Sequence, residues 1–165
     1  MDKGIIPTIL TIINALFGLL AIINSIEEEY STAAVFLILA VLTDFLDGKI
    51  ARKLGKESDF GKELDSLADI ISFGVAPCVF AYTLGNIESI SVFVMIIFLA
   101  CGMIRLARFN ITDNEYFVGM PITMNGLIIP VLYFIGAENY IVYAMLILAF
   151  LMVSPLKFPK LGRKK

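Results

Sequence analysis

The apolar stretch from Ile5 to about Ile26 is the feature that most restricts the fold of this chain. About 20 mostly apolar residues are enough for a helix to cross the hydrocarbon core of a bilayer. The stretch is longer than the roughly 7–15-residue apolar region of a signal peptide. Three glutamates follow it in place of a cleavage site. We therefore expect a retained membrane-spanning helix.

Five further segments approach this length and composition. The six expected spans are residues 5–26, 32–54, 61–84, 89–109, 119–137 and 139–156. The chain has 165 residues and is 59% hydrophobic, whereas soluble domains are roughly 45–50% apolar. So small a chain has too little interior to hide that surface from water. We predict an all-α integral membrane protein with six transmembrane helices, in one domain over residues 1–165. A soluble helical globule with an unusually apolar core is the alternative.

The basic residues lie on one side of this six-span arrangement. All 13 lysines and arginines fall near the N-terminus, between the second and third spans, at the end of the fourth span, or in the C-terminal tail. The opposite turns carry glutamates and neither lysine nor arginine. By the positive-inside rule, both termini are expected to be cytoplasmic. The net charge of −2 gives no support for a nucleic-acid partner.

The chain contains no histidine. This excludes Ser-His and Cys-His catalysis and histidine-ligated zinc. The two cysteines, Cys78 and Cys101, stand alone in apolar runs and are expected to be packing residues. Acid–base chemistry would therefore fall to carboxylates, lysine, tyrosine or cysteine.

Four aspartates interrupt the second and third spans. Asp44 and Asp47 are spaced to lie on one face of a helix, and so are Asp65 and Asp69. The connection between the two helices, KLGKESD, is short enough to make them antiparallel neighbours. The two acidic faces are therefore expected to oppose each other, below the level of the lipid headgroups.

The same connection contains signals for where each helix ends and begins. Gly55 is expected to end the second helix in a left-handed conformation. Ser58 or Asp59 is expected to cap the third.

An ionised aspartate at that depth costs at least a few kcal/mol, and four together repel one another. Divalent cations offset both effects, because Mg²⁺, Mn²⁺ and Ca²⁺ prefer carboxylate oxygens. Two ions bridged by carboxylates recur at sites that handle phosphoryl oxygens. A divalent-cation transporter is the rival interpretation, but its pathway should also carry polar groups in the outer half, where the sequence has no comparable cluster.

Small and basic residues flank the aspartates on the same helix faces. Gly48 and Gly61 allow a ligand to approach the backbone closely. Ala51 leaves space for a flat group, and Arg52 suits phosphate. Close helix–helix packing is the structural alternative for the two glycines.

The stretch TDFLDGKIARKLGKESDFGKELDSLAD resembles the signature of the CDP-alcohol phosphotransferase family, D-x2-D-G-x2-A-R-x8-G-x3-D-x3-D, with every gap matched. The resemblance implies a six-helix membrane fold, usually a homodimer, that joins a CDP-linked lipid to an alcohol and releases CMP. It implies two Mg²⁺ or Mn²⁺ ions held by Asp44, Asp47 and Asp65. It further implies that Asp69 is the general base and an additional ligand of the second metal. The implied contacts to the CDP-lipid are Asp47, Gly48, Ala51, Arg52, Gly61 and Asp65.

The flanking stretches DSLADIISFGVAPCVFAY, RLARFNIT, YFVGMPITMNG and MVSPLKFP resemble the bacterial and archaeal phosphatidylserine synthases of this family. The resemblance implies L-serine as acceptor and CDP-diacylglycerol or CDP-archaeol as donor, with the active site facing the cytoplasm at the cell membrane. The carboxylate of serine needs a cation, and Arg105 and Arg108 are candidates, with Asn110 assisting. Acceptors that carry phosphate, which would give phosphatidylglycerol phosphate or phosphatidylinositol phosphate, also need arginines and remain the alternative.

Overall fold

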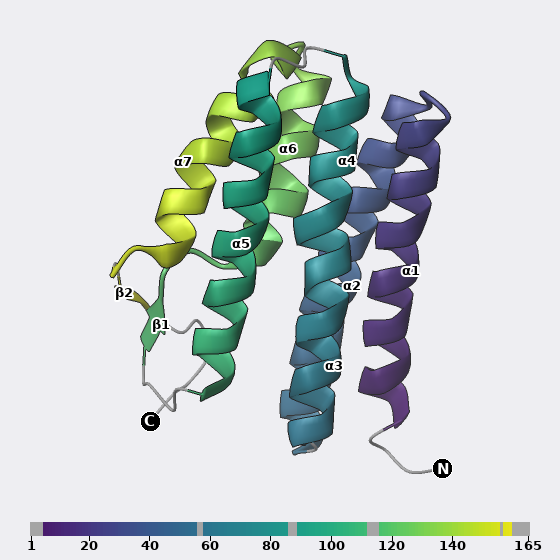
Figure 1. The fold of residues 1–165 in the computed structure, drawn as a ribbon. Helices are drawn as coiled ribbons and strands as arrows, with labels where there is room; N and C mark the ends of the chain where they lie inside the picture. The colour runs from purple at the N-terminus through teal and green to yellow at the C-terminus, as the bar shows by residue number, and fades with distance from the viewer. Residues whose placement is uncertain (1–4, 56–57, 86–88, 112–115, 156, 160–165) are drawn as a thin grey trace.

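The computed structural model describes residues 5–55, 58–85, 89–111, 116–155 and 157–159. These residues form a bundle of helices that run up and down along one axis, with a short two-stranded ribbon at its side (Figure 1). The prediction of an all-α fold is confirmed for the bundle, and the ribbon was not predicted. Seven charged residues used in the topology prediction lie outside the described residues: Lys3, Lys56, Glu88, Lys160, Arg163, Lys164 and Lys165.

The first two helices, α1 (Ile5–Ile26) and α2 (Tyr30–Leu54), form an antiparallel pair. Both helices bury alanines, and such small side chains let membrane helices pack closely. Helix α2 ends where the sequence predicted. Gly55 adopts a left-handed conformation with φ of 60°, and its N–H bonds back to the carbonyl groups of the last turn.

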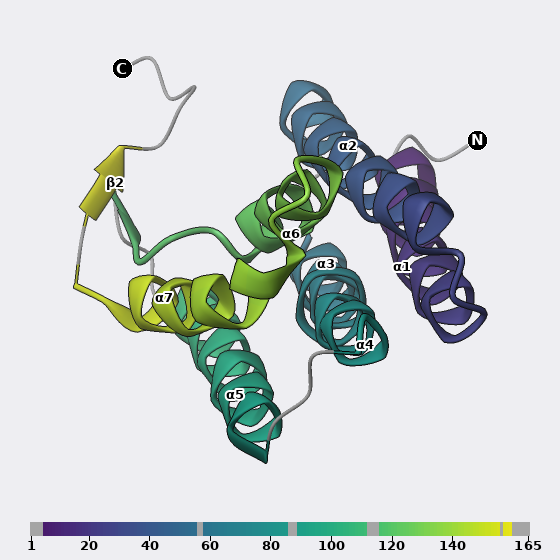
Figure 2. The ribbon, with the colours of Figure 1, turned by 90° about the horizontal axis from the view of Figure 1, so that it is seen from above.

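The central element is a continuous helical rod made of α3 (Asp59–Asp69), η1 (Ile70–Val75) and α4 (Ala76–Thr83). The predicted cap is confirmed, because Ser58 Oγ accepts a hydrogen bond from the Gly61 N–H at 3.0 Å. The η1 segment is π-helical and has a wider turn than its neighbours. Seen from above, the rod lies in the middle of the bundle, with α1, α2, α5 and α6 around it (Figure 2).

The second half of the chain contains α5 (Ser89–Ile111), β1 (Tyr116–Val118), η2 (Ile122–Met124), α6 (Asn125–Phe134), η3 (Glu138–Tyr140), α7 (Ile141–Val153) and β2 (Lys157–Pro159). Strands β1 and β2 pair antiparallel, with Phe117 opposite Phe158. The ribbon ties the segment before α6 to the segment after α7.

The last two predicted spans, 119–137 and 139–156, were drawn too long. The helix of the first begins only at Ile122, because Gly119 has φ of 82° and Pro121 is extended. A Cβ atom on Gly119 would overlap the Met152 carbonyl, so this segment is pressed against the end of α7. The boundaries of the other four predicted spans agree with the observed helices to within two residues.

Aromatic side chains join the start of α2 to the ends of α4 and α6, and these helix ends lie at the upper end of the bundle in Figure 1. The ring of Phe80 on α4 meets the rings of Tyr30 on α2 and Tyr133 on α6 edge to face, at centroid distances of 6.2 and 5.5 Å. The Tyr30 hydroxyl also donates to the Thr83 carbonyl at 2.6 Å. This end of the bundle is therefore held by both stacking and hydrogen bonding.

Three described helical stretches are long and apolar enough to cross a membrane, namely Ile5–Ile26, Asp59–Thr83 and Ile90–Ile111. The stretches Ile122–Phe134 and Glu138–Val153 are also apolar but shorter. Helix α2 has the length, but charged residues interrupt its second half. The start of α1, the end of α2, the start of α3 and the end of α5 all lie at the lower end of the bundle (Figure 1). The expected clustering of these helix ends is thus observed.

Candidate active site

Helix α2 contributes two aspartates to the interior of the bundle. Asp47 is buried, with 5% of its surface exposed, and Asp44 one turn earlier is partly buried. The Thr11 hydroxyl of α1 donates a hydrogen bond to Asp47 Oδ2 at 2.9 Å. Helix α1 therefore fixes the orientation of this carboxylate.

Helix α3 contributes the other two aspartates, Asp65 and Asp69, from one of its faces. The Gly55 turn and the Ser58 cap reverse the chain within a few residues, so this face meets the acidic face of α2. Asp69 is as enclosed as Asp47, with 5% of its surface exposed. The predicted opposition of two acidic helix faces is therefore observed.

The carboxylates form a compact cluster suited to a hard cation. One oxygen from each of Asp44, Asp47 and Asp65 lies within 4.8 Å of the others. Asp69 interacts electrostatically with all three. Among the described residues, Asp65 Oδ1 and Asp69 Oδ1 are buried and accept no hydrogen bond. Buried carboxylate oxygens without partners, and no nitrogen or sulfur donor in the cluster, fit Mg²⁺, Mn²⁺ or Ca²⁺.

Arg105 of α5 brings a positive charge to the same cluster. Its side chain is 8% exposed and interacts electrostatically with Asp44, Asp65 and Asp69. The guanidinium also lies over the Phe109 ring, 5.4 Å from its centroid. The sequence predicted Arg105 only as a residue that binds the acceptor alcohol, whereas the structure brings it to the edge of the acidic cluster.

The two other acceptor candidates lie farther along α5. The exposed Arg108 donates to the Val153 carbonyl at the end of α7, at 3.5 Å. Asn110 bridges α5 to α3, donating to Ser66 Oγ at 3.0 Å and to Glu63 Oε1 at 3.3 Å. The structure therefore buries Arg105 where it interacts electrostatically with the aspartates, and it ties the exposed Arg108 to the end of α7.

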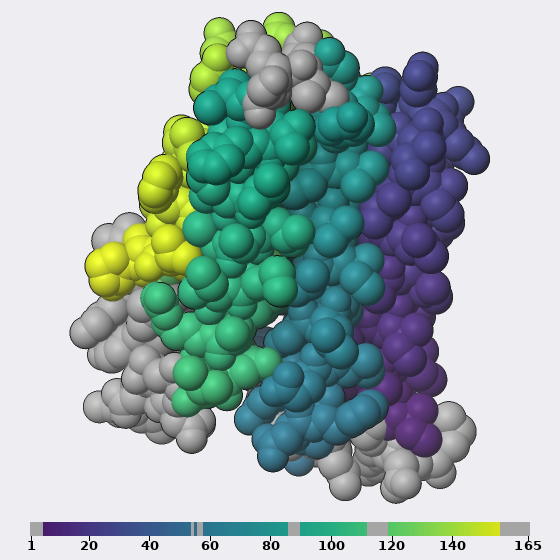
Figure 3. Space-filling view, in the orientation of Figure 1, coloured from purple at the N-terminus to yellow at the C-terminus, as the bar shows by residue number. Residues whose placement is uncertain are grey.

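The predicted nucleotide-binding residues follow the acidic faces toward the helix ends. The Arg52 guanidinium lies over Gly48, where a Cβ atom would be 3.6 Å from its Nη1. Ala51 is half-buried in the next turn, and Gly61 stands in the capped first turn of α3. In the space-filling view, a hollow separates the lower parts of α3 and α5 (Figure 3). These two helices carry Asp65, Asp69 and Arg105.

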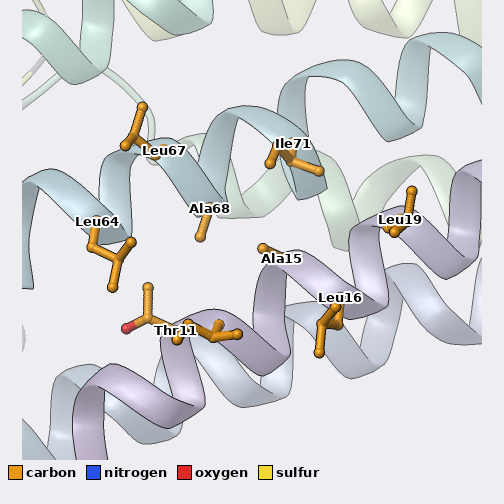
Figure 4. A pocket seen from close by; sticks show the side chains of 9 residues that line it. Thr11, Ala15, Leu16, Leu19, Leu64, Leu67, Ala68 and Ile71 are labelled. Atoms are coloured by element: carbon orange, nitrogen blue, oxygen red, sulfur yellow. The ribbon is translucent and has the colours of Figure 1, made fainter. Parts of the chain in front are cut away.

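An apolar groove of about 310 Å³ lies between α1 and the rod. One wall is lined by Leu64, Leu67, Ala68 and Ile71 of the rod, and of these Leu64 and Ala68 point toward α1 (Figure 4). The α1 wall consists of Thr11, Ile12, Ala15, Leu16 and Leu19. Among the described lining residues Thr11 alone has a polar side chain, and the same residue bonds to Asp47. The groove therefore adjoins the acidic cluster.

Thr11 is a site residue that the sequence did not reveal. A lone hydroxyl in an apolar span usually bonds to its own helix, and Thr11 Oγ1 also lies 3.1 Å from the Pro7 carbonyl. Its second bond, to Asp47, joins residues 36 positions apart. Only the pairing of α1 with α2 brings them together.

An apolar helical bundle with a buried carboxylate cluster defines a class of membrane-embedded proteins that handle divalent cations and anionic ligands. The chain belongs to the CDP-alcohol phosphatidyltransferase family, whose model matches residues 4–154. The family resemblance expected from the aspartate signature is thereby confirmed.

Curated relatives agree with this assignment. The chain is 39% identical to a CDP-diacylglycerol–serine O-phosphatidyltransferase of Bacillus subtilis (strain 168), over 93% of this chain and 89% of the relative. It is 36% identical to an archaetidylserine synthase of Methanothermobacter thermautotrophicus, over 94% and 70% of the two chains. A CDP-diacylglycerol–serine O-phosphatidyltransferase of Methanocaldococcus jannaschii is 40% identical, over 93% and 73%.

Proposed function

We propose that this protein transfers the phosphatidyl or archaetidyl group of a CDP-lipid to the hydroxyl group of L-serine and releases CMP. The observation that carries the proposal is the convergence of Asp44, Asp47 and Asp65 within 4.8 Å, with Asp69 buried beside them. Family membership supports the phosphotransfer, and the names of relatives similar over most of the chain support serine as acceptor.

Asp44, Asp47 and Asp65 are the proposed ligands of two Mg²⁺ or Mn²⁺ ions, and Asp69 is a further ligand of one of them. The partnerless oxygens of Asp65 and Asp69 support this assignment, because a buried carboxylate oxygen needs a donor or a cation. The bound ions would neutralise the pyrophosphate and the departing CMP.

Asp69 is the proposed general base. Its carboxylate takes the proton of the serine hydroxyl, whose oxygen forms a bond to the phosphorus that bears the lipid. The bond from that phosphorus to the CMP oxygen breaks, and CMP carries away the electron pair. The absence of histidine from the sequence supports a carboxylate in this role.

The nucleotide and the acceptor occupy different sides of the cluster in this proposal. Gly48, Ala51, Arg52 and Gly61, with Asp47 and Asp65, contact the CDP part of the donor. Arg105 binds the serine carboxylate, which its burial beside the aspartates supports. Asn110 and Arg108 line the approach from the end of α5.

The apolar groove between α1 and the rod is the proposed seat for a hydrocarbon chain of the donor lipid. Its continuity with Thr11 and Asp47 supports this, because the lipid head would then reach the cluster while its tail stays in apolar surroundings. We propose further that residues 1–165 form one domain with six transmembrane passes, cytoplasmic termini and a site facing the cytoplasm, and that it assembles as a homodimer in the cell membrane.

The purified full chain, supplied with CDP-diacylglycerol and Mg²⁺ or Mn²⁺, tests the function by CMP release. We expect release with L-serine and not with glycerol 3-phosphate or inositol phosphate. Release with either phosphate-bearing alcohol but not with serine would overturn the choice of acceptor. Activity that survives complete chelation of divalent cations would overturn the metal requirement.

A further inference from the structure

The central rod contains a proline that affects the helix geometry next to the acidic cluster. Pro77 lies in the first turn of α4 and has no N–H to donate. In a regular α-helix that N–H would bond to the Phe73 carbonyl, four residues earlier, and the proline ring would crowd the same carbonyl. The rod widens into the π-helical η1 segment at this place, and the Ala76 N–H reaches the Ile71 carbonyl, five residues back.

The Phe73 carbonyl finds its hydrogen-bond donor on a different helix. Asn125, the first residue of α6, donates from Nδ2 to this carbonyl at 3.2 Å, across 52 residues of sequence. Asn125 is fully buried, and its other contact from Nδ2 is to the Met152 sulfur at 3.5 Å. Its Oδ1 accepts no hydrogen bond in the part of the chain that the structure describes. The buried Asn125 amide thus has one backbone partner in an apolar interior. That partner is the Phe73 carbonyl, to which Pro77 cannot donate.

The packing around this bond leaves little freedom for the π-helical turn. The Phe73 ring presses on Gly126, where a Cβ atom would come within 2.5 Å of the ring. The neighbouring Ser72 donates to the Asn14 carbonyl of α1 at 2.9 Å. Both Phe73 and Ser72 are fully buried. Successive residues of η1 are therefore fixed against α6 and α1.

The turn begins at the residue after Asp69, so its width sets the direction of the acidic face. A π-helical turn accommodates one residue more than an α-helical turn, and one residue of an α-helix corresponds to about 100° of rotation. If the rod ran through as a plain α-helix while Phe73 stayed on α6, Asp65 and Asp69 would rotate away from α2.

We infer that Asn125 is a positioning residue, which holds the Phe73 carbonyl and thereby keeps Asp65 and Asp69 aimed at Asp44 and Asp47. This role deepens the proposed function. It rests on one part of that proposal, namely that the aspartates bind divalent cations. In this role Asn125 acts through the rod, by its bond to the Phe73 carbonyl.

The test uses the full chain in detergent micelles or nanodiscs and measures Mn²⁺ binding directly, from the loss of the free-ion electron paramagnetic resonance signal. Asn125→Asp keeps the shape of the side chain and removes both N–H donors. We expect the half-saturating Mn²⁺ concentration to rise about tenfold, as for other residues that orient metal ligands. The matched control is Asn24→Asp, since the half-buried Asn24 donates to the Leu20 carbonyl of its own helix, and the Mn²⁺ affinity of this variant is expected to stay unchanged.

Two further variants separate positioning from simple loss of folding. Asn125→Ala removes the donors without adding a charge and is expected to show the same shift of Mn²⁺ affinity. Pro77→Ala restores an N–H within the rod and favours a plain α-helix. This variant is expected to unfold at no lower temperature than the wild type and yet to need about tenfold more Mn²⁺. In the Pro77→Ala background, Asn125→Ala should change the Mn²⁺ affinity less than about twofold, because Phe73 no longer needs the outside donor.

The inference would be overturned if the folded fraction of every Asn125 variant bound Mn²⁺ with wild-type affinity. It would also be overturned if the Pro77 and Asn125 substitutions changed the Mn²⁺ affinity independently, so that their fold-changes multiplied in the double variant. These outcomes are distinct from failure of the proposed function. A wild-type protein that binds Mn²⁺ but forms no serine lipid would contradict the proposed reaction while the shift in the Asn125 variants still supported the positioning role.

Discussion

At the scale of single residues, Asp47 and Asp69 are equally buried but have different partners. Asp47 accepts a hydrogen bond from Thr11. Asp69 Oδ1 accepts none among the described residues. The hydroxyl of Thr11 fixes the direction of the Asp47 carboxylate before a cation binds. The open oxygen of Asp69 can take either a cation or a proton, as its two proposed roles of further metal ligand and general base require.

Asp69→Asn is expected to lower kcat by roughly 10²–10⁴-fold, because the amide cannot take the proton of the acceptor hydroxyl. Binding of CDP-lipid should be partly retained, since the other aspartates remain. Turnover measured as CMP release, together with a direct CDP-lipid binding assay, checks both statements. The control is Asp59→Asn at the exposed start of the same helix. Near-normal turnover of Asp69→Asn would refute the assignment of the base.

Thr11→Val is expected to raise the metal concentration for half-maximal activity about tenfold, because it removes the hydrogen bond that orients Asp47 while nearly preserving side-chain volume. Thr43→Val is the matched control. Thr43 directly precedes Asp44, and among the described residues its hydroxyl bonds to carbonyl groups of its own helix. Equal shifts in the two variants would show that the Thr11–Asp47 bond has no special effect.

Arg105→Lys is expected to raise the KM for serine at least tenfold with little change in the KM for CDP-lipid. Lysine keeps the charge but loses the paired donors that bind a carboxylate. Arg108→Lys, which alters a contact to Val153 at the surface, should have a smaller effect. Steady-state kinetics with serine varied at saturating CDP-lipid provides the measurement. A larger rise in the KM for serine in Arg108→Lys than in Arg105→Lys would assign the binding of the serine carboxylate to Arg108 instead of Arg105.

At the scale of helices and turns, local signals in the sequence predicted the parts of the site that lie close together in the chain. The spacing of the aspartates, the left-handed Gly55 and the cap at Ser58 all depend on residues within one or two turns. The position of Arg105 beside the aspartates could not be predicted, because it depends on how α5 packs against the rod. The π-helical turn was also missed. Pro77 was visible in the sequence, but the donor that stabilises the open carbonyl comes from α6.

The groove between α1 and the rod gives an element-scale prediction. Ala15→Phe places a ring in the apolar groove, so the KM for long-chain CDP-lipid should rise several-fold. A short-chain CDP-lipid does not fill the groove, and its kinetics should change little. Ile23→Phe adds a ring to the same helix at an exposed position outside the groove and provides the control. Equal effects on long and short chains would contradict the groove as a lipid seat.

At the scale of the whole molecule, the orientation in the membrane can be tested with single cysteines. In a variant whose native cysteines are replaced by alanine, Lys53→Cys is expected to resist a membrane-impermeant maleimide in intact cells and to react after lysis. Glu28→Cys, in the turn at the other end of the bundle, should react in intact cells. The expectation follows from the basic residues near the end of α2. The reverse labelling pattern would invert the proposed topology.

The aromatic contacts of Tyr30, Phe80 and Tyr133 lie at the end of the bundle remote from the acidic cluster. They bind α2, α4 and α6 together next to Thr83, while Asp69 lies 14 residues earlier on the same rod, about 20 Å along its axis at about 1.5 Å per residue. The aromatic contacts and the carboxylates therefore lie at separate levels of the bundle, so the tie between α2, α4 and α6 and the candidate cation site depend on different side chains.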